Sequence, residues 1–158
     1  MRRRLAALAL GVAAAIVSFT LDQLAKARWL ASSESPAGFW YLRGWVQSID
    51  HHNHGITFNL PLPNVITLFI TLIALAWVAR ESYRAYIRQD VRALFFLGLI
   101  VGGALGNAYD RAMFNYVRDW LLLWFRSAVN LADISILVGA LGYLWVRWTE
   151  KTKQEISS

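Results

Sequence analysis

The sequence lacks cysteine altogether, and it is poor in proline and in charged side chains. Without cysteine the chain forms no disulfide framework, thiol nucleophile or cysteine-based zinc site of its own. Three prolines and ten glycines in 158 residues exclude a low-complexity chain. Only 16% of the residues are charged and 57% are hydrophobic, which excludes a disordered chain and is too apolar for a typical soluble domain. The composition indicates a membrane protein.

The net charge of +6 does not indicate a nucleic-acid partner. Nucleic-acid binding needs basic residues gathered on one water-exposed face, whereas long uncharged stretches separate the basic residues here. We therefore expect no nucleic acid among the partners of this chain.

Four stretches without any charged residue are the candidates for membrane-spanning helices. They run over residues 5–21, 64–79, 93–109 and 134–146, and hold 17, 16, 17 and 13 residues. A hydrocarbon core of about 30 Å needs roughly 20 helical residues, so each helix must extend into polar neighbours. We predict an all-α membrane protein, a single domain over residues 1–158, with four transmembrane helices at about 5–22, 64–80, 92–111 and 130–147.

The first span also has the pattern of a cleaved signal peptide, because an arginine-rich start precedes an alanine- and leucine-rich stretch. However, three more spans follow it, and no convincing small-x-small cleavage site precedes Asp22. We expect this span to be retained.

Basic residues near the span ends predict the orientation of the helices. Ten flank the termini and the link between the second and third spans: Arg2, Arg3, Arg4, Arg80, Arg84, Arg88, Arg92, Arg147, Lys151 and Lys153. Six lie on the opposite side: Lys26, Arg28, Arg43, Arg111, Arg118 and Arg126. Because loops rich in lysine and arginine stay in the cytoplasm, both termini are predicted to be cytoplasmic.

The outer segment between the first two spans is predicted to contain short strands. From about residue 37 to 62 the aromatic and β-branched content rises, and Gly44 and Gly55 interrupt it. Amphipathic tryptophan rings favour the membrane interface, and several lie near span ends: Trp29, Trp40, Trp45, Trp120 and Trp124. We expect this small β-rich segment to rest on the membrane.

Gly98, Gly102 and Gly106 recur every four residues in the third predicted helix. This spacing places them on one helix face, where the missing side chains let another helix approach closely. We predict tight helix packing along this face.

Acidic residues mark three predicted helix ends at the outer membrane boundary. Asp22 ends the first span, Asp110 ends the third, and Asp133 precedes the fourth. A carboxylate costs about 2.5 to 3.5 kcal/mol at mid-membrane and less toward the interface, so it usually faces a protein interior or a wet cavity. Asp22 with Lys26 also suits a structural ion pair, and Asp110 with Arg111 suits membrane anchoring. For both pairs, structural support and substrate contact are retained as alternatives.

Asp119 and Asp133 have no basic partner at helical spacing apart from Arg118, which adjoins Asp119. Thirteen residues separate the two aspartates, enough for the link to bring both carboxyls over one cavity. Two carboxyls a few ångström apart cannot both ionise easily, so one keeps a proton near neutral pH. Such a pair supplies the base and the acid that peptide hydrolysis by water requires.

Five sequence blocks give the whole chain a resemblance to the lipoprotein signal peptidases, also called signal peptidase II. The blocks are residues 22–26 (DQLAK), 53–58 (NHGITF), 102–111 (GGALGNAYDR), 117–119 (VRD) and 130–133 (NLAD). The resemblance implies a multi-pass aspartic endopeptidase of the bacterial inner membrane, with its active site near the periplasmic face. It implies removal of the signal peptide of a prolipoprotein immediately before a diacylglyceryl-modified cysteine. The implied partners are these prolipoproteins and membrane lipid, and we expect a monomer without a cofactor.

By this resemblance Asp119 and Asp133 are the catalytic pair. The residues implied to shape the site or to hold substrate are Asp22, Lys26, Asn53, Gly55, Asn107, Arg111, Asn130 and Ala132. Arg111 presents a planar fork of donors suited to carbonyl or carboxylate oxygens, and Asn107 lies one turn earlier on the same helix face. Asn130 suits hydrogen bonding to an aspartate or a substrate amide, and it also suits a helix N-cap.

Three departures from the usual family pattern leave a rival interpretation open. Asn115 stands where glycine is usual, Val129 stands where an aromatic residue is usual, and the link from Asp119 to Asp133 is a few residues shorter. The rival is a catalytically inactive relative that binds lipoprotein precursors or lipid. A proton-conducting transporter is disfavoured, because the first and third spans carry no charged relay.

His51, His52 and His54 form a cluster with a spacing that can bind zinc. No acidic partner completes a zinc-hydrolase signature such as His-Glu-x-x-His. We expect an ordinary polar loop and no metal site.

Overall fold

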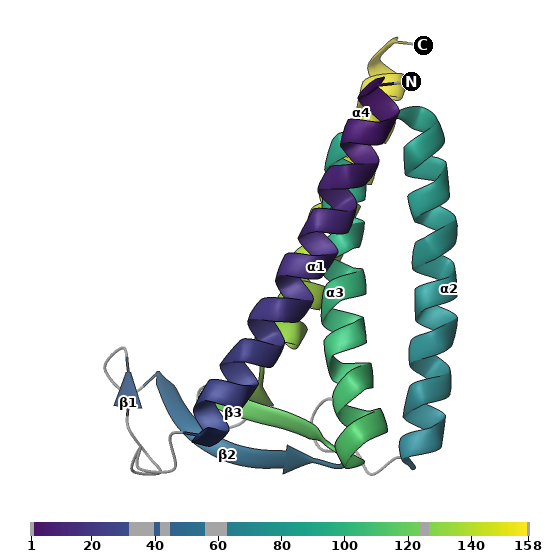
Figure 1. Cartoon of the computed structure of the whole chain (residues 1–158). Helices are drawn as coiled ribbons and strands as arrows, with labels where there is room; N and C mark the ends of the chain where they lie inside the picture. Colours follow the sequence, from purple (N-terminus) through teal and green to yellow (C-terminus); the bar gives the residue numbers. More distant parts are fainter. Residues whose placement is uncertain (1, 32–39, 42–44, 56–62, 124–126, 158) are drawn as a thin grey trace.

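The computed structural model describes residues 2–31, 40–41, 45–55, 63–123 and 127–157, which form four long helices and a small sheet. The helices are α1 (Arg2–Ala31), α2 (Asn64–Arg88), α3 (Val91–Phe114) and α4 (Leu131–Ser157). The strands are β1 (Trp40–Tyr41), β2 (Val46–Asn53), β3 (Val117–Leu123) and β4 (Ser127–Val129). Figure 1 shows both termini at one end of the helices and the sheet lying across the other end.

The four predicted transmembrane helices are confirmed, since all four are long and apolar enough to cross a membrane. Each is longer than its uncharged stretch, as the thickness of a bilayer requires. Large apolar side chains remain on the outside of the bundle, for example Val65, Phe69 and Leu72 of α2. Lipid tails are as apolar as these side chains, so a bilayer gives no reason to bury them.

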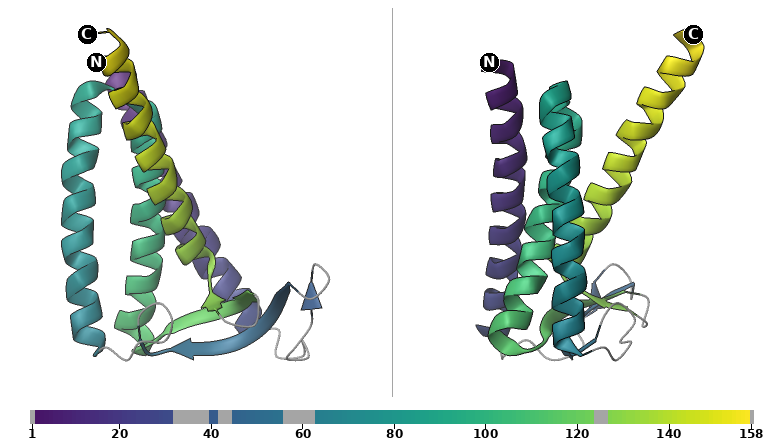
Figure 2. Two further views of the ribbon diagram at one scale, coloured as in Figure 1. Left: turned by 180° about the vertical axis from the view of Figure 1, so that it is seen from behind. Right: turned by 90° about the vertical axis from the view of Figure 1, so that its right-hand side faces the viewer.

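Helix α3 packs against α1, α2 and α4. In Figure 2, α4 leans away from α1 toward the end that carries the termini. Glycines bring α1 and α3 close together, since an added Cβ at Gly98 would lie 2.2 Å from the Gly11 carbonyl oxygen. At Gly102 it would lie 2.4 Å from the carbonyl oxygen of Ala15. The predicted close packing along this glycine face is therefore confirmed, with α1 as the partner.

The sheet has the order β1-β2-β3-β4, and each neighbouring pair is antiparallel. Strands were predicted only between the first two spans, and this placement was incomplete. β3 and β4 come from the link between α3 and α4, for which the sequence predicts no strands. Pairing with β2 satisfies the backbone groups of this apolar link. The predicted strand residues Phe39, Ile56, Thr57 and Phe58, and also Trp124, lie outside the described residues.

The pairing of β2 with β3 decides which side chains reach the helix ends. His51 lies opposite Asp119, and Asn53 lies opposite Val117. Because successive residues of a strand face opposite sides, Arg118 and Asp119 point away from each other. Strand β3 therefore presents a carboxylate on one face and a guanidinium on the other.

Candidate active site

The carboxylates predicted at three helix ends belong to one buried polar cluster. It lies where α1, α3, α4 and β3 meet, at the sheet end of the bundle. Asp22 and Asp110 have no exposed surface, and Asp119 is 2% exposed. Buried charges are stable only when they are paired and hydrogen-bonded, so the partners of each carboxylate define the site.

The start of α4 fixes the position of Asp133. Asn130 Oδ1 accepts the backbone N–H of Asp133 at 3.0 Å, and Asp133 Oδ2 accepts the backbone N–H of Asn130 at 3.3 Å. This reciprocal pair is a capping box, which satisfies two donors that a helix start leaves free. The predicted N-cap at Asn130 is confirmed, and Asp133 lies in the first turn, where the helix dipole favours a negative charge.

Asp119 reaches the same place from β3. Its Oδ1 accepts the side-chain amide of Asn130 at 2.6 Å, and its Oδ2 accepts that of Asn53 at 3.1 Å. Asn130 therefore holds both aspartates of the predicted pair, one through its side chain and the other through its backbone. The two carboxylates are close enough to interact electrostatically.

Burial raises the pKa of Asp119 from 3.8 to about 7, and the nearby charge of Asp133 adds to the rise. The hydrogen bonds from Asn53 and Asn130 and the charge of Lys26 lower this pKa but do not cancel the rise. Asp119 therefore retains a proton up to near-neutral pH. A carboxyl in this state can donate a hydrogen bond, as the acid of a carboxyl pair must.

Asn107 gives Asp133 a second support. Its Nδ2 donates to Asp133 Oδ1 at 2.7 Å. Its Oδ1 accepts from Lys26 Nζ and from Asn130 Nδ2, each at 3.2 Å. Because an ammonium group can only donate, Lys26 fixes the Asn107 amide with its NH₂ group toward Asp133.

Lys26 lies fully buried between two carboxylates. Its Nζ is 2.7 Å from Asp22 Oδ2 and 3.1 Å from Asp110 Oδ2. The other oxygen of Asp22 accepts the backbone N–H of Ala132 at 2.9 Å, at the start of α4. Removing one partner of a buried ion pair costs about 3 to 5 kcal/mol, so this group fastens α1, α3 and α4 together. The structural alternative for Asp22 and Lys26 therefore has direct geometric support.

Gln23 and Arg118 also belong to the cluster, although neither is among the predicted site residues. Arg118 clamps Asp110 through Nη2 to Oδ1 at 2.6 Å, Nε to Oδ2 at 3.2 Å and its backbone N–H to Oδ2 at 3.1 Å. Gln23 Nε2 donates to Asp22 and Asp110, and its Oε1 accepts from Arg118 at 2.8 Å. The one available signal was their place in the sequence blocks, Gln23 beside Asp22 and Arg118 beside Asp119.

Asp110 and Arg111 are adjacent in sequence, which suits membrane anchoring, but the two side chains have different partners. Asp110 pairs with Lys26 and Arg118. Arg111 Nη2 donates to the Gly55 carbonyl at 3.2 Å, and its charge acts on both Asp119 and Asp133. Gly55 is held in turn, because its N–H donates to Asn53 Oδ1 at 3.0 Å. Asn53, Gly55 and Arg111 thus connect the end of β2 to the aspartate pair.

The charges of the cluster balance only when the aspartate pair holds one proton. The buried cations are Lys26, Arg111 and Arg118. The carboxylates are those of Asp22, Asp110, Asp119 and Asp133. An uncompensated charge in a buried site is costly, so this balance favours one shared proton.

The departures from the family pattern leave the local backbone intact. Asn115 ends α3 at φ 65° and ψ 11°, a left-handed conformation that glycine adopts most easily and asparagine next. Asparagine therefore substitutes for glycine here without a change of fold. Val129 pairs with Leu121, so the short link is shaped by the β3–β4 pairing.

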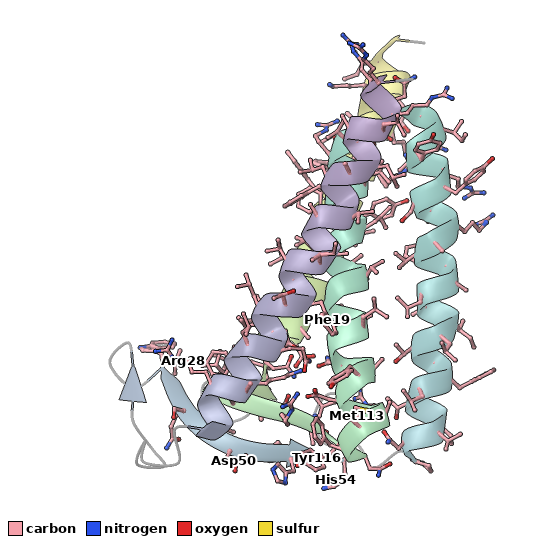
Figure 3. All side chains as sticks on the ribbon, in the orientation of Figure 1. Phe19, Arg28, Asp50, His54, Met113 and Tyr116 are labelled. Carbon is pink, nitrogen blue, oxygen red and sulfur yellow. The ribbon has the colours of Figure 1, made fainter. Side chains whose placement is uncertain are left out.

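The polar loop predicted for the histidine cluster was wrong for His51 and His52, which lie in β2, and the cluster packs against an aromatic side chain. The rings of His52 and Tyr116 are stacked with centroids 4.1 Å apart, and the centroid of His54 is 5.4 Å from that of Tyr116. Figure 3 shows His54 and Tyr116 together at the sheet end of α3. Among the residues that the structure describes, no three histidine, aspartate or glutamate side chains are grouped to hold a metal ion.

Known proteins are similar to this chain both in sequence and in fold. The model of the family described as "Signal peptidase (SPase) II" matches residues 14–149. A lipoprotein signal peptidase of Solibacter usitatus is 33% identical over 144 residues, covering 84% of this chain and 85% of the relative. One from Methylobacterium is 32% identical over 151 residues, covering 87% of each. A solved bacterial membrane enzyme has the same fold, with a TM-score of 0.77 at 20% identity over 90% of each chain.

Proposed function

This chain belongs to the signal peptidase II family, and on that premise we propose that Asp119 and Asp133 form its catalytic pair. The enzyme is an aspartic endopeptidase that removes the signal peptides of prolipoproteins. None of the comparisons favours the rival interpretation of an inactive binding protein. The contact of Asn130 with both aspartates carries the assignment of the pair.

In the proposed reaction Asp133 is the base and Asp119 is the acid. Asp133 lies in the first turn of α4, where the helix dipole favours the ionised member. Asp119 has a pKa of about 7 and suits the protonated member. Asp133 takes a proton from a water molecule as its oxygen attacks the scissile carbonyl. Asp119 polarises that carbonyl and later protonates the leaving nitrogen.

Over one reaction cycle the aspartate pair neither gains nor loses a proton. The pair begins with a proton on Asp119 and ends with one on Asp133, which has taken it from the water. The new carboxylic acid loses its own proton to solvent. Transfer of a proton within the pair then restores the starting state, so no cofactor is needed for the acid–base steps.

Arg111 and the amides around the pair are proposed to hold the substrate. Arg111 uses Nη2 on Gly55, and its remaining donors suit a peptide carbonyl beside the scissile bond. Asp22, Lys26, Asn107 and Ala132 are proposed to position the pair without touching substrate. All these groups come from one chain, so the site is complete in a monomer.

The substrate class proposed for this site is a prolipoprotein that carries a diacylglyceryl-modified cysteine, cut immediately before that cysteine. We infer lateral access from the bilayer, because such a substrate is an apolar helix bearing lipid chains. The chain is a multi-pass membrane protein. We place it in the bacterial inner membrane with the pair near the periplasmic face, because the basic flanks of the termini favour the cytoplasm.

Replacement of either aspartate tests the catalytic assignment. We expect Asp119→Asn and Asp133→Asn each to abolish prolipoprotein processing in a strain that lacks signal peptidase II, followed as the precursor-to-mature shift on gels. An amide neither takes a proton from water nor donates one to the leaving nitrogen. Loss by at least about a thousandfold is the expected scale.

The matched control is Asp50→Asn on β2, an exposed aspartate at the same end of the molecule. It should process the substrate like the unchanged protein. Equal expression and thermal unfolding of the three variants would separate a catalytic loss from a folding defect. Undiminished processing by both pair variants would refute the assignment.

A further inference from the structure

A cavity of about 380 Å³ lies on the Arg118 face of β3, opposite to the face that carries Asp119. Its walls come from the last turns of α1 and the end of α3. Phe19, Tyr109 and Phe114 supply aromatic rings, and Thr20, Leu24 and Ala27 supply smaller surfaces. Phe19 and Tyr109 meet edge to face with centroids 6.1 Å apart. Figure 3 shows Phe19 between the ribbons of α1 and α3.

One charged side chain is built into the wall of this cavity. Arg118 is 9% exposed, and its Cζ lies 4.5 Å from the centroid of the Phe114 ring. Its Nε and Nη2 are used on Asp110 and Gln23. Within the described part of the chain, its Nη1 has no hydrogen-bond partner. A buried guanidinium is therefore held rigidly while one of its nitrogens still has donors to offer.

The charge around Arg118 specifies what kind of acceptor fits. Arg118 and Lys26 are balanced by Asp22 and Asp110, with all four in direct contact through ion pairs. A phosphate here would leave a buried negative charge without a counterion. A neutral acceptor such as an ester carbonyl takes the free donors without changing this balance.

The position of the cavity on the outside of the helices indicates that the neutral acceptor for Arg118 comes from the bilayer. Leu24 and Tyr109 at the cavity are 60% and 43% exposed, on helices long and apolar enough to span a membrane. The cavity lies near the ends of these helices, on the sheet side, where the glycerol esters of bilayer lipids lie. Its aromatic and aliphatic walls fit the first methylene groups of an acyl chain.

We propose that this cavity binds a glycerophospholipid from the leaflet on the sheet side. One ester carbonyl accepts a hydrogen bond from Arg118 Nη1. The first methylene groups of the acyl chain pack against Phe19, Leu24 and Tyr109. The site is distinct from the aspartate pair, and the proposal does not depend on the catalytic assignment. The bound lipid completes the hydrogen bonds of the residue that fastens β3 to α3.

Photolabelling in nanodiscs tests the site directly. The full chain is reconstituted with phosphatidylethanolamine that carries a diazirine near the top of one acyl chain, and labelled peptides are identified by mass spectrometry. A second preparation uses the diether lipid with the same chains, which lacks the ester carbonyls. We expect labelling within residues 19–27 and 109–118 to be about three- to tenfold higher with the diester, the scale of one hydrogen bond.

Cavity-filling variants provide the matched comparison. Ala27→Trp and Thr20→Phe place a large ring in the cavity, and each should reduce labelling of these peptides several-fold. Ala13→Trp puts the same ring on an exposed position of α1 outside the cavity and should leave the labelling unchanged. Two filling variants keep the test valid if one of them does not fold.

Three results would overturn the proposal. Equal labelling along all of α1 would mean that the cavity meets only the general lipid belt. Equal labelling by diester and diether lipids would exclude the carbonyl contact. Loss of labelling on addition of a diacylglyceryl-modified prolipoprotein to Asp119→Asn protein would assign the cavity to the substrate's own chains. Unchanged lipid labelling in Asp119→Asn protein without substrate would support the site even if the catalytic assignment failed.

Discussion

Asn130 both caps helix α4 and holds the carboxylate of Asp119. Its side-chain oxygen and backbone N–H cap α4 through Asp133, while its side-chain nitrogen holds Asp119 and contacts Asn107. Any shift of the cap would move both carboxylates together. The relative position of the pair is therefore set by one side chain that is 0% exposed, which is a form of preorganisation for acid–base chemistry.

The pKa of Asp119 predicts how processing depends on pH. This pKa is raised from 3.8 to about 7, so Asp119 is protonated below that pH and ionised above it. The acid form is thus present at low pH and lost as pH rises, and kcat/KM should fall about tenfold per pH unit above 7. The hydrogen bond from Asn53 lowers this pKa, so Asn53→Ala should move the fall to higher pH. Initial rates on a purified prolipoprotein between pH 5 and 9 measure both.

His51 is the control for this pH profile, because it lies opposite Asp119 across the β2–β3 pair. Arg111, Lys26 and Asp133 are the other charged groups that act on Asp119 or its neighbours. His51→Gln should leave the midpoint of the fall unchanged. Loss of this midpoint in His51→Gln protein would contradict the assignment of the pH dependence to Asp119.

At the residue scale, local spacing is what could be predicted. Asn130 and Asp133 stand three apart at a helix start, so their capping contact follows from sequence. The role of Arg118 does not, because Gln23 lies 95 residues away and only the folded chain brings the two together. A buried arginine in a strand is also rare enough that composition alone argues against it.

At the scale of elements, the α1–α3 contact connects packing to the site. Gly98 and Gly102 let the two backbones nearly touch, and Gly106 leaves the space that the Asp22 carboxylate fills. Asp22 then reaches across to the Ala132 N–H of α4. Close packing of two helices thereby sets the position of the third.

Substitutions on this glycine face should separate stability from activity. At Gly102 an added Cβ would lie 2.4 Å from a backbone oxygen, so Gly102→Ala should destabilise the protein by about 1 to 3 kcal/mol. At Gly106 it would lie 2.7 Å from Asp22 Oδ2, a side-chain atom that can move. The unfolding temperature of Gly106→Ala protein should therefore lie closer to that of the unchanged protein, but this variant should process substrate more slowly. Thermal unfolding in detergent and initial rates distinguish the two.

Ala112→Leu is the control, since it adds a larger group at an exposed position of the same helix. It should change neither the unfolding temperature nor the rate. If Gly102→Ala were as stable as this control, the backbones of α1 and α3 would have to lie farther apart than the structure places them.

The elements differ in how well sequence predicts them. Uncharged stretches located all four helices, because the thickness of a bilayer constrains their length. β3 was not predicted, because the segment VRDWLLL shows no clean alternation of apolar and polar residues. Its partner β2 is also more than sixty residues away in the sequence. Strand pairing of this kind depends on tertiary contacts that local patterns do not contain.

On the scale of the whole molecule, polarity is divided between the two ends. The sheet end holds the buried ionic cluster and the aspartate pair, while the end with the termini carries the basic flanks (Figure 1). The sequence predicted this division from span order and charge. It could not predict that three cations and four carboxylates share one network, because that depends on how the helix ends converge.

The absence of cysteine makes the predicted membrane orientation directly testable, since the unchanged chain gives no background with thiol reagents. Asp50 is exposed at the sheet end, and Lys151 is exposed near the C-terminus. In spheroplasts, a membrane-impermeant maleimide should label Asp50→Cys protein at once and Lys151→Cys protein only after permeabilisation. This labelling is expected because basic flanks favour the cytoplasm, and termini held there would leave the sheet and the aspartate pair outside. The opposite labelling would invert the topology and separate the pair from a substrate presented at the outer face.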